Sequence, residues 1–115
     1  MKKTKMLKKN YEFGMVLKKG TYFSGKMIEA FIKRNSQDTN FLGIAISSKI
    51  CKAVKRNYIK RLIRENYKNI ENQINTGYSI VFLWKRKVDI KQASYPNVEE
   101  DMKKIFAKAK LFLED

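Results

Sequence analysis

The spacing of hydrophobic residues changes several times along the 115-residue chain, and the first spacing is helical. Apolar residues three and four positions apart predict an amphipathic helix over residues 11–18. Asn10 is a suitable N-cap for this helix, and Gly20 is a suitable end. Its apolar side consists of Phe13, Val16 and Leu17.

Alternation of apolar and polar residues follows, which is typical of half-buried strands. Residues 21–34 predict one strand, or two if Gly25 interrupts it, and the polar residues 35–40 predict a turn. Residues 41–47 predict a further strand with two unlike faces. The bulky face consists of Leu42, Ile44 and Ile46, and the small face consists of Gly43, Ala45 and Ser47. The small face leaves room for a ligand, and close packing of a helix explains it equally well.

The second half of the chain predicts a helix, a strand and a second helix. A long helix is expected over residues 52–74, followed by Thr76-Gly77 as its stop. The apolar run 78–84 predicts a strand buried on both faces, and residues 85–95 predict a basic loop. Asn97-Val-Glu-Glu100 predicts a capping box that opens a last helix. The apolar stripe of that helix consists of Val98, Met102, Ile105, Phe106, Ala109 and Leu113.

These elements predict an α/β sandwich in which a sheet packs against helices. The length of 115 residues fits a single domain over residues 1–115, with residues 1–8 as a flexible basic segment.

The long central helix carries the candidate function. At about 100° per residue, its cationic and amide side chains fall within an arc of about 140°. This arc consists of Arg56, Asn57, Lys60, Arg61, Arg64 and Lys68. The opposite side consists of Tyr58, Ile59, Leu62, Ile63, Asn66 and Ile70, and Lys55 falls close to that side. Because like charges four residues apart are destabilising, the arc favours a polyanionic ligand over a merely solvated helix face.

The overall charge strengthens this interpretation. Lys and Arg number 26 against 11 Asp and Glu, which gives a net charge of +15. Self-repulsion of this size indicates a polyanionic partner, which is a nucleic acid, an anionic membrane surface or an acidic protein. A membrane-surface peptide is disfavoured, because a hydrophobic content of 43% provides a core. The sequence therefore predicts a small protein that binds structured RNA.

The residue types that are missing exclude several chemistries. The chain has no histidine, and its lone Cys51 can form neither an intramolecular disulfide nor a structural zinc site. No recognisable two-metal set of acidic residues is present, so neither catalytic nor metal-binding residues are predicted. The longest strongly apolar run, Ile80–Trp84, is too short to cross a bilayer. We therefore expect a cytoplasmic protein with no membrane partner and no small-molecule substrate.

One stretch of the chain resembles a known family. Residues 49–64 are similar to the signature helix of the bacterial ribonuclease P protein subunit, with the pattern Ala-Val-Xaa-Arg-Asn-Xaa-Xaa-Lys-Arg-Xaa-Xaa-Arg over residues 53–64. Leu7-Lys-Lys-Asn-Xaa-Xaa-Phe13 and Gly20-Thr21 resemble the N-terminal part of that family. The chain departs from the family pattern at Ser48-Lys49, Cys51-Lys52 and Tyr58.

The resemblance implies both a fold and a function. The fold has the order helix, three strands, helix, strand, helix, with a mixed sheet and a left-handed strand–helix–strand crossover. The function is that of the non-catalytic protein component of ribonuclease P, an endoribonuclease that removes the 5′ leader of precursor tRNA and produces 5′-phosphomonoesters. A catalytic RNA subunit performs the chemistry with Mg²⁺, which the RNA and the substrate mainly hold, and the protein is inactive without that RNA. The implied partners are the catalytic RNA subunit and precursor tRNA.

The resemblance also indicates two sets of site residues. The set expected to bind the RNA subunit consists of Lys49, Lys52, Lys55, Arg56, Asn57, Lys60, Arg61, Arg64 and Lys68. The set expected to form a leader-binding groove consists of Phe13, Leu17, Phe31, Gly43 and Ala45. From the residues alone, a core role for Phe13, Leu17 and Phe31 is equally well supported.

Two other classes of function stay open at this point. A ribosomal or RNA-chaperone protein would need basic helices but no leader groove. An independent metal-dependent nuclease would cleave RNA with Mg²⁺ and without an RNA subunit.

Overall fold

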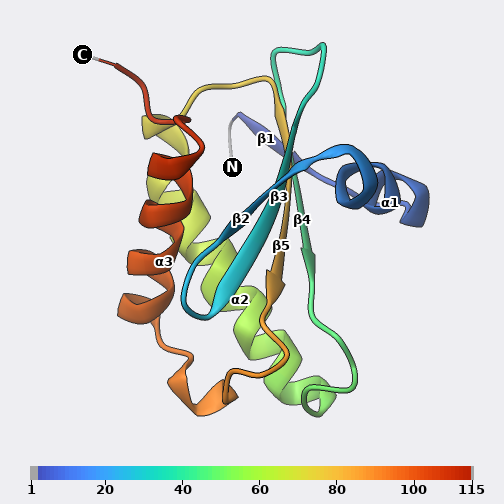
Figure 1. Ribbon diagram of the computed structural model, residues 1–115, viewed down its shortest axis with the longest axis vertical. Coiled ribbons are helices and arrows are strands. Elements are labelled where there is room, and N and C mark those ends of the chain that lie inside the picture. The colour runs from blue at the N-terminus through green and yellow to red at the C-terminus, as the bar shows by residue number, and fades with distance from the viewer. Residues whose placement is uncertain (1–2, 115) are drawn as a thin grey trace.

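Five strands and three helices follow one another in the computed structural model, which describes residues 3–114 (Figure 1). In chain order they are β1 Thr4–Met6, α1 Asn10–Lys19, β2 Thr21–Ser24, β3 Ile28–Arg34, β4 Asn40–Ala45, α2 Ala53–Ile70, β5 Tyr78–Trp84 and α3 Tyr95–Lys108. Two short 3-10 helices, Glu71–Gln73 and Ile90–Gln92, follow α2 and precede α3. From α1 onward, the predicted order of elements and the interruption at Gly25 are confirmed.

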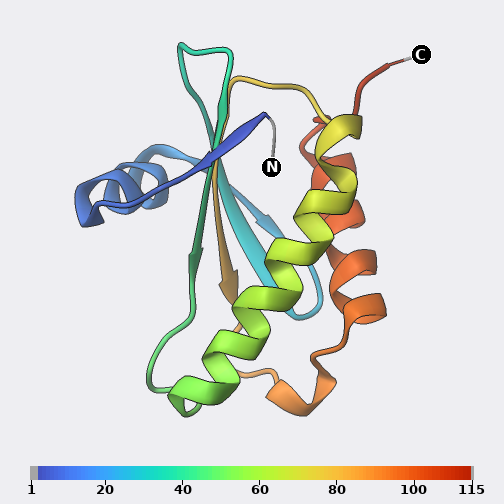
Figure 2. The same ribbon diagram turned by 180° about the vertical axis from the view of Figure 1, so that it is seen from behind.

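The strands form one mixed sheet with the order β1-β4-β5-β3-β2. Neighbours β1 and β4, and β4 and β5, are parallel, whereas β3 is antiparallel to β5 and β2. Figure 2 shows α2 in front of the sheet, with β4 and β5 both running downward and β5 to the right of β4. The β4–α2–β5 crossover is therefore left-handed, as the family resemblance implies and contrary to the general preference for right-handed crossovers.

The helices divide into two layers on opposite faces of the sheet (Figures 1 and 2). The main core lies under α2 and α3. It contains all three residues of the predicted bulky face, Leu42 and Ile44 from β4 and Ile46 just beyond the end of that strand. Under α1 lies a smaller cluster of the buried residues Leu7, Val16 and Val81. Because α1 covers only part of its face, this layer leaves sheet residues accessible.

Gly43 shows how closely α1 packs on the sheet. A Cβ atom at this position would lie 2.6 Å from Cε1 of Phe13 and 3.0 Å from Cδ1 of Leu7. Close packing of α1 therefore explains the small residue. We predicted that Gly43 lines an open groove, but it is buried. Ala45, two residues further along β4, is only half-buried.

The strand β1 was not predicted, because residues 1–8 were expected to form a flexible segment. Residues 1–2 lie outside the described residues, but Thr4–Met6 pair with β4. Oγ1 of Thr4 and Oη of Tyr67 are 2.6 Å apart in a buried hydrogen bond, and Nδ2 of Asn40 donates to the same Oη at 3.4 Å. Burial raises the pKa of Tyr67 above its ordinary value of 10.0, so this phenol is neutral at physiological pH. A short strand without an alternating pattern is held by contacts that are distant in sequence.

Both predicted N-terminal caps were wrong. The N-cap of α1 is Lys9, not Asn10, and the carboxylate of Glu12 accepts the backbone N–H groups of Lys8 and Lys9 at 3.2 and 2.9 Å. The N-cap of α3 is Ser94, whose hydroxyl accepts the N–H of Asn97 at 3.3 Å, so the helix starts before the predicted capping box.

Three predicted elements are also shorter than expected. β4 ends at Ala45, α2 ends at Ile70 where a 3-10 helix continues the chain, and α3 ends at Lys108. Leu113, expected in the stripe of the last helix, is exposed beyond its end.

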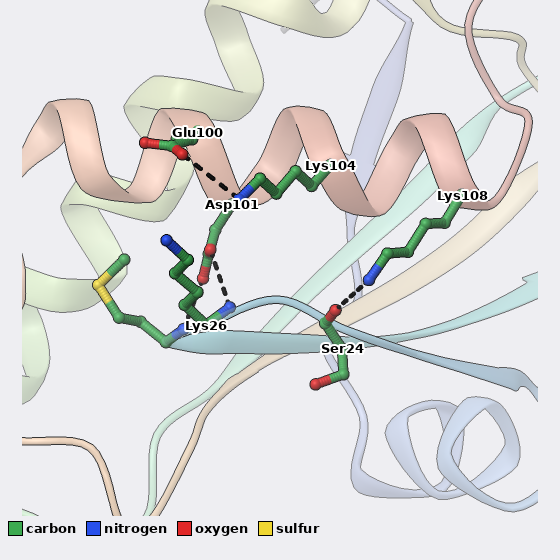
Figure 3. A network of polar contacts seen from close by, with 7 residues as sticks. Ser24, Lys26, Glu100, Asp101, Lys104 and Lys108 are labelled. Atoms are coloured by element: carbon green, nitrogen blue, oxygen red, sulfur yellow. Dashed lines mark hydrogen bonds and ion pairs between the residues drawn. The ribbon is translucent and has the colours of Figure 1, made fainter.

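Asp101 attaches the β2–β3 hairpin to α3 (Figure 3). Its buried carboxylate accepts three backbone N–H groups at 2.6–2.9 Å, from Lys26, Met27 and Ile28. A Cβ atom on Gly25 would lie 2.7 Å from Cγ of Asp101, so glycine permits this close approach. The carboxylate thus fixes the turn that connects β2 to β3.

We expect Asp101→Asn to lower the free energy of unfolding by about 2–3 kcal/mol, because the amide N–H₂ would face backbone donors that each cost about 1–3 kcal/mol when left unsatisfied. Urea denaturation measures this change. The matched control is Glu100→Gln, which removes an exposed carboxylate that pairs with Lys104 at 3.4 Å and should cost less than about 1 kcal/mol. Equal losses in the two variants would contradict the role of Asp101.

Candidate nucleic-acid interface

The outward side of α2 presents the predicted basic arc. Asn57, Arg61 and Lys68 are exposed, and Arg56, Lys60 and Arg64 are half-buried. The inward side packs in the main core through Ile59, Leu62, Ile63, Asn66, Tyr67 and Ile70. Within the described part of the chain, no cation of the arc lies within 4.0 Å of a carboxylate. The positive charge of this side is therefore available to a ligand.

One position on the wheel was assigned to the wrong side. Tyr58 was expected among the apolar residues, but it is 39% exposed and its ring centroid lies 5.8 Å from Cζ of Arg61. Lys55 falls close to the apolar side on the wheel, but it lies in the first turn of α2 and is exposed. Buried Tyr67 was missed, because a tyrosine gives no clear sign of which side it occupies.

An open depression of about 640 Å³ runs along the basic side of α2. It is lined by Val54, Lys55, Asn57, Tyr58, Lys60, Arg61 and Arg64. Val54 and Tyr58 were not predicted to take part, and they add apolar and aromatic surface to the cationic lining. Such a surface suits a nucleotide, which combines an aromatic base with a phosphate.

The N-terminal end of α2 concentrates positive charge further. Lys52 is its N-cap, Lys55 and Arg56 lie in its first turns, and no acidic residue offsets the positive end of the helix dipole there. Nη1 of Arg56 donates to the carbonyl oxygen of Cys51 at 2.7 Å, which closes the loop before the helix. Lys49 lies exposed in that loop. Arg56 therefore has a structural contact as well as a charge.

The second candidate surface lies beside α1. Phe13 and Phe31 are half-buried and pack against the cluster of Leu7, Val16 and Val81. Leu17 lies one turn beyond Phe13 and is 36% exposed. The structure therefore brings Phe13 and Phe31 to the same side of the sheet, with Leu17 on the same helix.

Strand register adds three residues that the sequence analysis missed. Tyr22 pairs with Phe31, Glu29 pairs with Leu83, and Leu83 pairs with Ala45. These residues share the face that α1 partly covers, and all of them are exposed or half-buried. We call the set Tyr22, Glu29, Phe31, Ala45 and Leu83 the open sheet face. No signal in the sequence could have placed Tyr22 beside Phe31, because the pairing depends on the hairpin at Gly25.

Tyr22 and Glu29 are bonded to each other on the open sheet face. The Tyr22 hydroxyl donates to Oε2 of Glu29 at 2.5 Å, and this bond raises the pKa of Tyr22. The Tyr22 and Phe31 ring centroids are 5.2 Å apart with a 54° tilt. The face thus combines two adjacent rings with one carboxylate.

The described residues contain no group of three or more His, Cys, Asp or Glu side chains that could hold a metal ion. No helix among them is both long enough and apolar enough to span a membrane.

Comparison with known proteins identifies the family. The family model for Ribonuclease P matches residues 1–110. The ribonuclease P protein component of Clostridioides difficile (strain 630) is 38% identical over 104 residues, or 90% of each chain. That of Clostridium botulinum (strain 657 / Type Ba4) is 33% identical over 113 residues, or 97% of this chain and 99% of the relative.

Solved structures agree with this result. The Staphylococcus aureus RNase P protein superposes with a TM-score of 0.82 at 29% identity, covering 94% of this chain and 97% of that chain. The Thermotoga maritima RNase P protein shares the fold, with a TM-score of 0.81 at 23% identity over 96% of this chain and 99% of that chain. The chain therefore belongs to the ribonuclease P protein family, the protein components of an endoribonuclease complex that processes tRNA.

Proposed function

We propose that this chain binds the catalytic RNA subunit of ribonuclease P through the outward side of α2, and the 5′ leader of precursor tRNA on the open sheet face. The observation that carries the proposal is the row of α2 cations that have no acidic partner among the described residues. Counterion release from phosphates gives such a row a strong, salt-dependent affinity for RNA. The two surfaces belong to different layers of the fold, so two RNA segments can bind at once (Figure 1).

The leader is assigned to the open sheet face because unpaired bases stack on aromatic side chains. Phe31 and Tyr22 provide adjacent rings there, and α1 provides Phe13 and Leu17 at the side. A paired tRNA stem cannot offer its base faces in this way, so the surface selects the single-stranded leader.

The protein does not perform the chemistry in this proposal. Mg²⁺ would be held mainly by the RNA subunit and the substrate, where it would supply an activated water and stabilise the leaving oxygen. The chain contributes cations that reduce repulsion between RNA phosphates, so the Mg²⁺ concentration needed for cleavage falls. The products would be tRNA with a 5′-phosphate and a leader with a 3′-hydroxyl. Family membership disfavours the ribosomal or RNA-chaperone alternative.

The decisive experiment is cleavage of precursor tRNA with and without the cognate RNA subunit, at low and high Mg²⁺. The protein alone should be inert at every Mg²⁺ concentration, and with the RNA subunit it should lower the Mg²⁺ requirement. Cleavage by protein free of RNA and of contaminating nuclease would instead support an independent nuclease.

The basic side of α2 predicts a steep salt dependence. If about six phosphates are neutralised, the slope of log K against log salt for RNA-subunit binding should be about −4 to −5. Replacing Lys60 and Arg64 with alanine should make the slope shallower by about 2, with little change in the melting temperature. Adding Arg56→Ala should weaken binding further and also destabilise the start of α2, because the bond to Cys51 is lost. A wild-type slope near zero would contradict the electrostatic interface.

The open sheet face predicts a leader-specific loss for Phe31→Ala. Binding of precursor tRNA should weaken by about 1–3 kcal/mol, which is the contribution of one stacked base, whereas binding of mature tRNA should barely change. Filter binding to the reconstituted complex measures both values. A purely core residue would behave differently, with a stability loss of about 3–5 kcal/mol and equal losses for the two tRNA forms.

A further inference from the structure

We infer that Glu29, held by Tyr22, recognises the identity of one leader base, favouring a base with an amino group on its pairing edge and guanine above all. The inference rests on the proposed leader site and assigns a specificity-determining residue within it. It concerns base identity, which the stacking of Phe31 alone does not distinguish.

The charge of Glu29 is the first observation. A surface that binds a polyanion is expected to be free of carboxylates, yet Glu29 occupies the middle of the open sheet face between Leu83 and the Tyr22–Phe31 pair. Within residues 3–114, Glu29 has no cation within 4.0 Å to neutralise it. An unneutralised carboxylate repels phosphates, so on this face it suits contact with a base edge rather than with the RNA backbone.

The orientation of Glu29 is the second observation. The Tyr22 hydroxyl donates to Oε2 at 2.5 Å, which fixes the carboxylate and leaves Oε1 with no hydrogen-bond partner among the described residues. Tyr22 is itself 48% exposed, and its ring lies next to that of Phe31. A base stacked on the Phe31 ring beside Tyr22 would therefore bring its edge to a fixed acceptor.

The chemistry of the four bases decides the preference. Guanine offers two neighbouring donors, N1–H and N2–H, which match Oε1 and the second lone pair of Oε2 in a charge-assisted, bidentate arrangement. Adenine and cytosine each offer one amino group. Uracil offers only N3–H between two carbonyl oxygens, and these oxygens would be repelled by the carboxylate. The expected order is guanine first and uracil last.

The test uses precursor tRNAs in which each leader position is in turn G, A, C or U. Binding to the reconstituted protein–RNA complex is measured under conditions that do not permit cleavage. For wild-type protein, one position should favour G over U by about tenfold to a hundredfold, the usual range for one bidentate base contact. Glu29→Gln should reduce this ratio at least about fivefold, because it weakens the contact with G and removes the charge that repels U.

Two further variants separate base recognition from general effects. Tyr22→Phe keeps the ring and releases the carboxylate, so the G-to-U ratio should fall. Glu100→Gln removes the same charge from the opposite layer and should leave the ratio unchanged. Three results would each overturn the inference. They are equal binding of all four bases at every position by wild-type protein, a G-to-U ratio that Glu29→Gln leaves unchanged, and a Glu100→Gln variant that lowers that ratio as much as Glu29→Gln does.

Failure of the proposed function would look different. If the leader does not touch the protein, precursor and leaderless tRNA bind equally well and Phe31→Ala changes neither affinity. If only the present inference fails, the advantage of precursor over leaderless tRNA persists, but it is the same for all four bases.

Discussion

Repulsion among the cations of α2 is the constraint that the rest of the structure must offset. The helix carries basic residues on successive turns, has no acid in its first turn, and places positive charge at the positive end of its own dipole. Its stability therefore depends on the inward side, where Ile59, Ile63 and Tyr67 are almost completely buried against the sheet and α3. The left-handed crossover brings this helix against the parallel pair β4 and β5, so the most buried strands support the most charged helix.

Much of this arrangement was predictable from the sequence, because periodicity reports burial directly. The inward side of α2 and the bulky face of β4 are confirmed by the observed cores, and so is most of the buried run of β5, in which Leu83 is only half-buried. The basic arc was predictable for the same reason, since residues excluded from the core must face outward. Tyrosines were the exception: Tyr58 and Tyr67 lie on opposite sides of α2, and an amphipathic side chain is compatible with either side.

What could not be predicted depends on contacts between residues distant in sequence. β1 has three residues, and it is fixed by pairing with β4 and by the bond between Thr4 and Tyr67. The open sheet face depends on the register of β2 with β3, which Asp101 on α3 helps to set. The double role of Arg56 depends on the path of the loop at Cys51. Each case needs a partner whose position only the folded chain defines.

The position of α1 also limits how an RNA strand can lie on the sheet. Phe13 and Val16 cover Gly43 and Val81, and the open sheet face consists of Tyr22 and Phe31 at one end of that row and of Glu29, Leu83 and Ala45 in the next row. Rows on one face are about 7 Å apart along a strand, and neighbouring strands are about 4.8 Å apart. The accessible strip is therefore narrow along the strands and longer across them. A single strand bound there, as we propose for the leader, would run crosswise over β4, β5, β3 and β2.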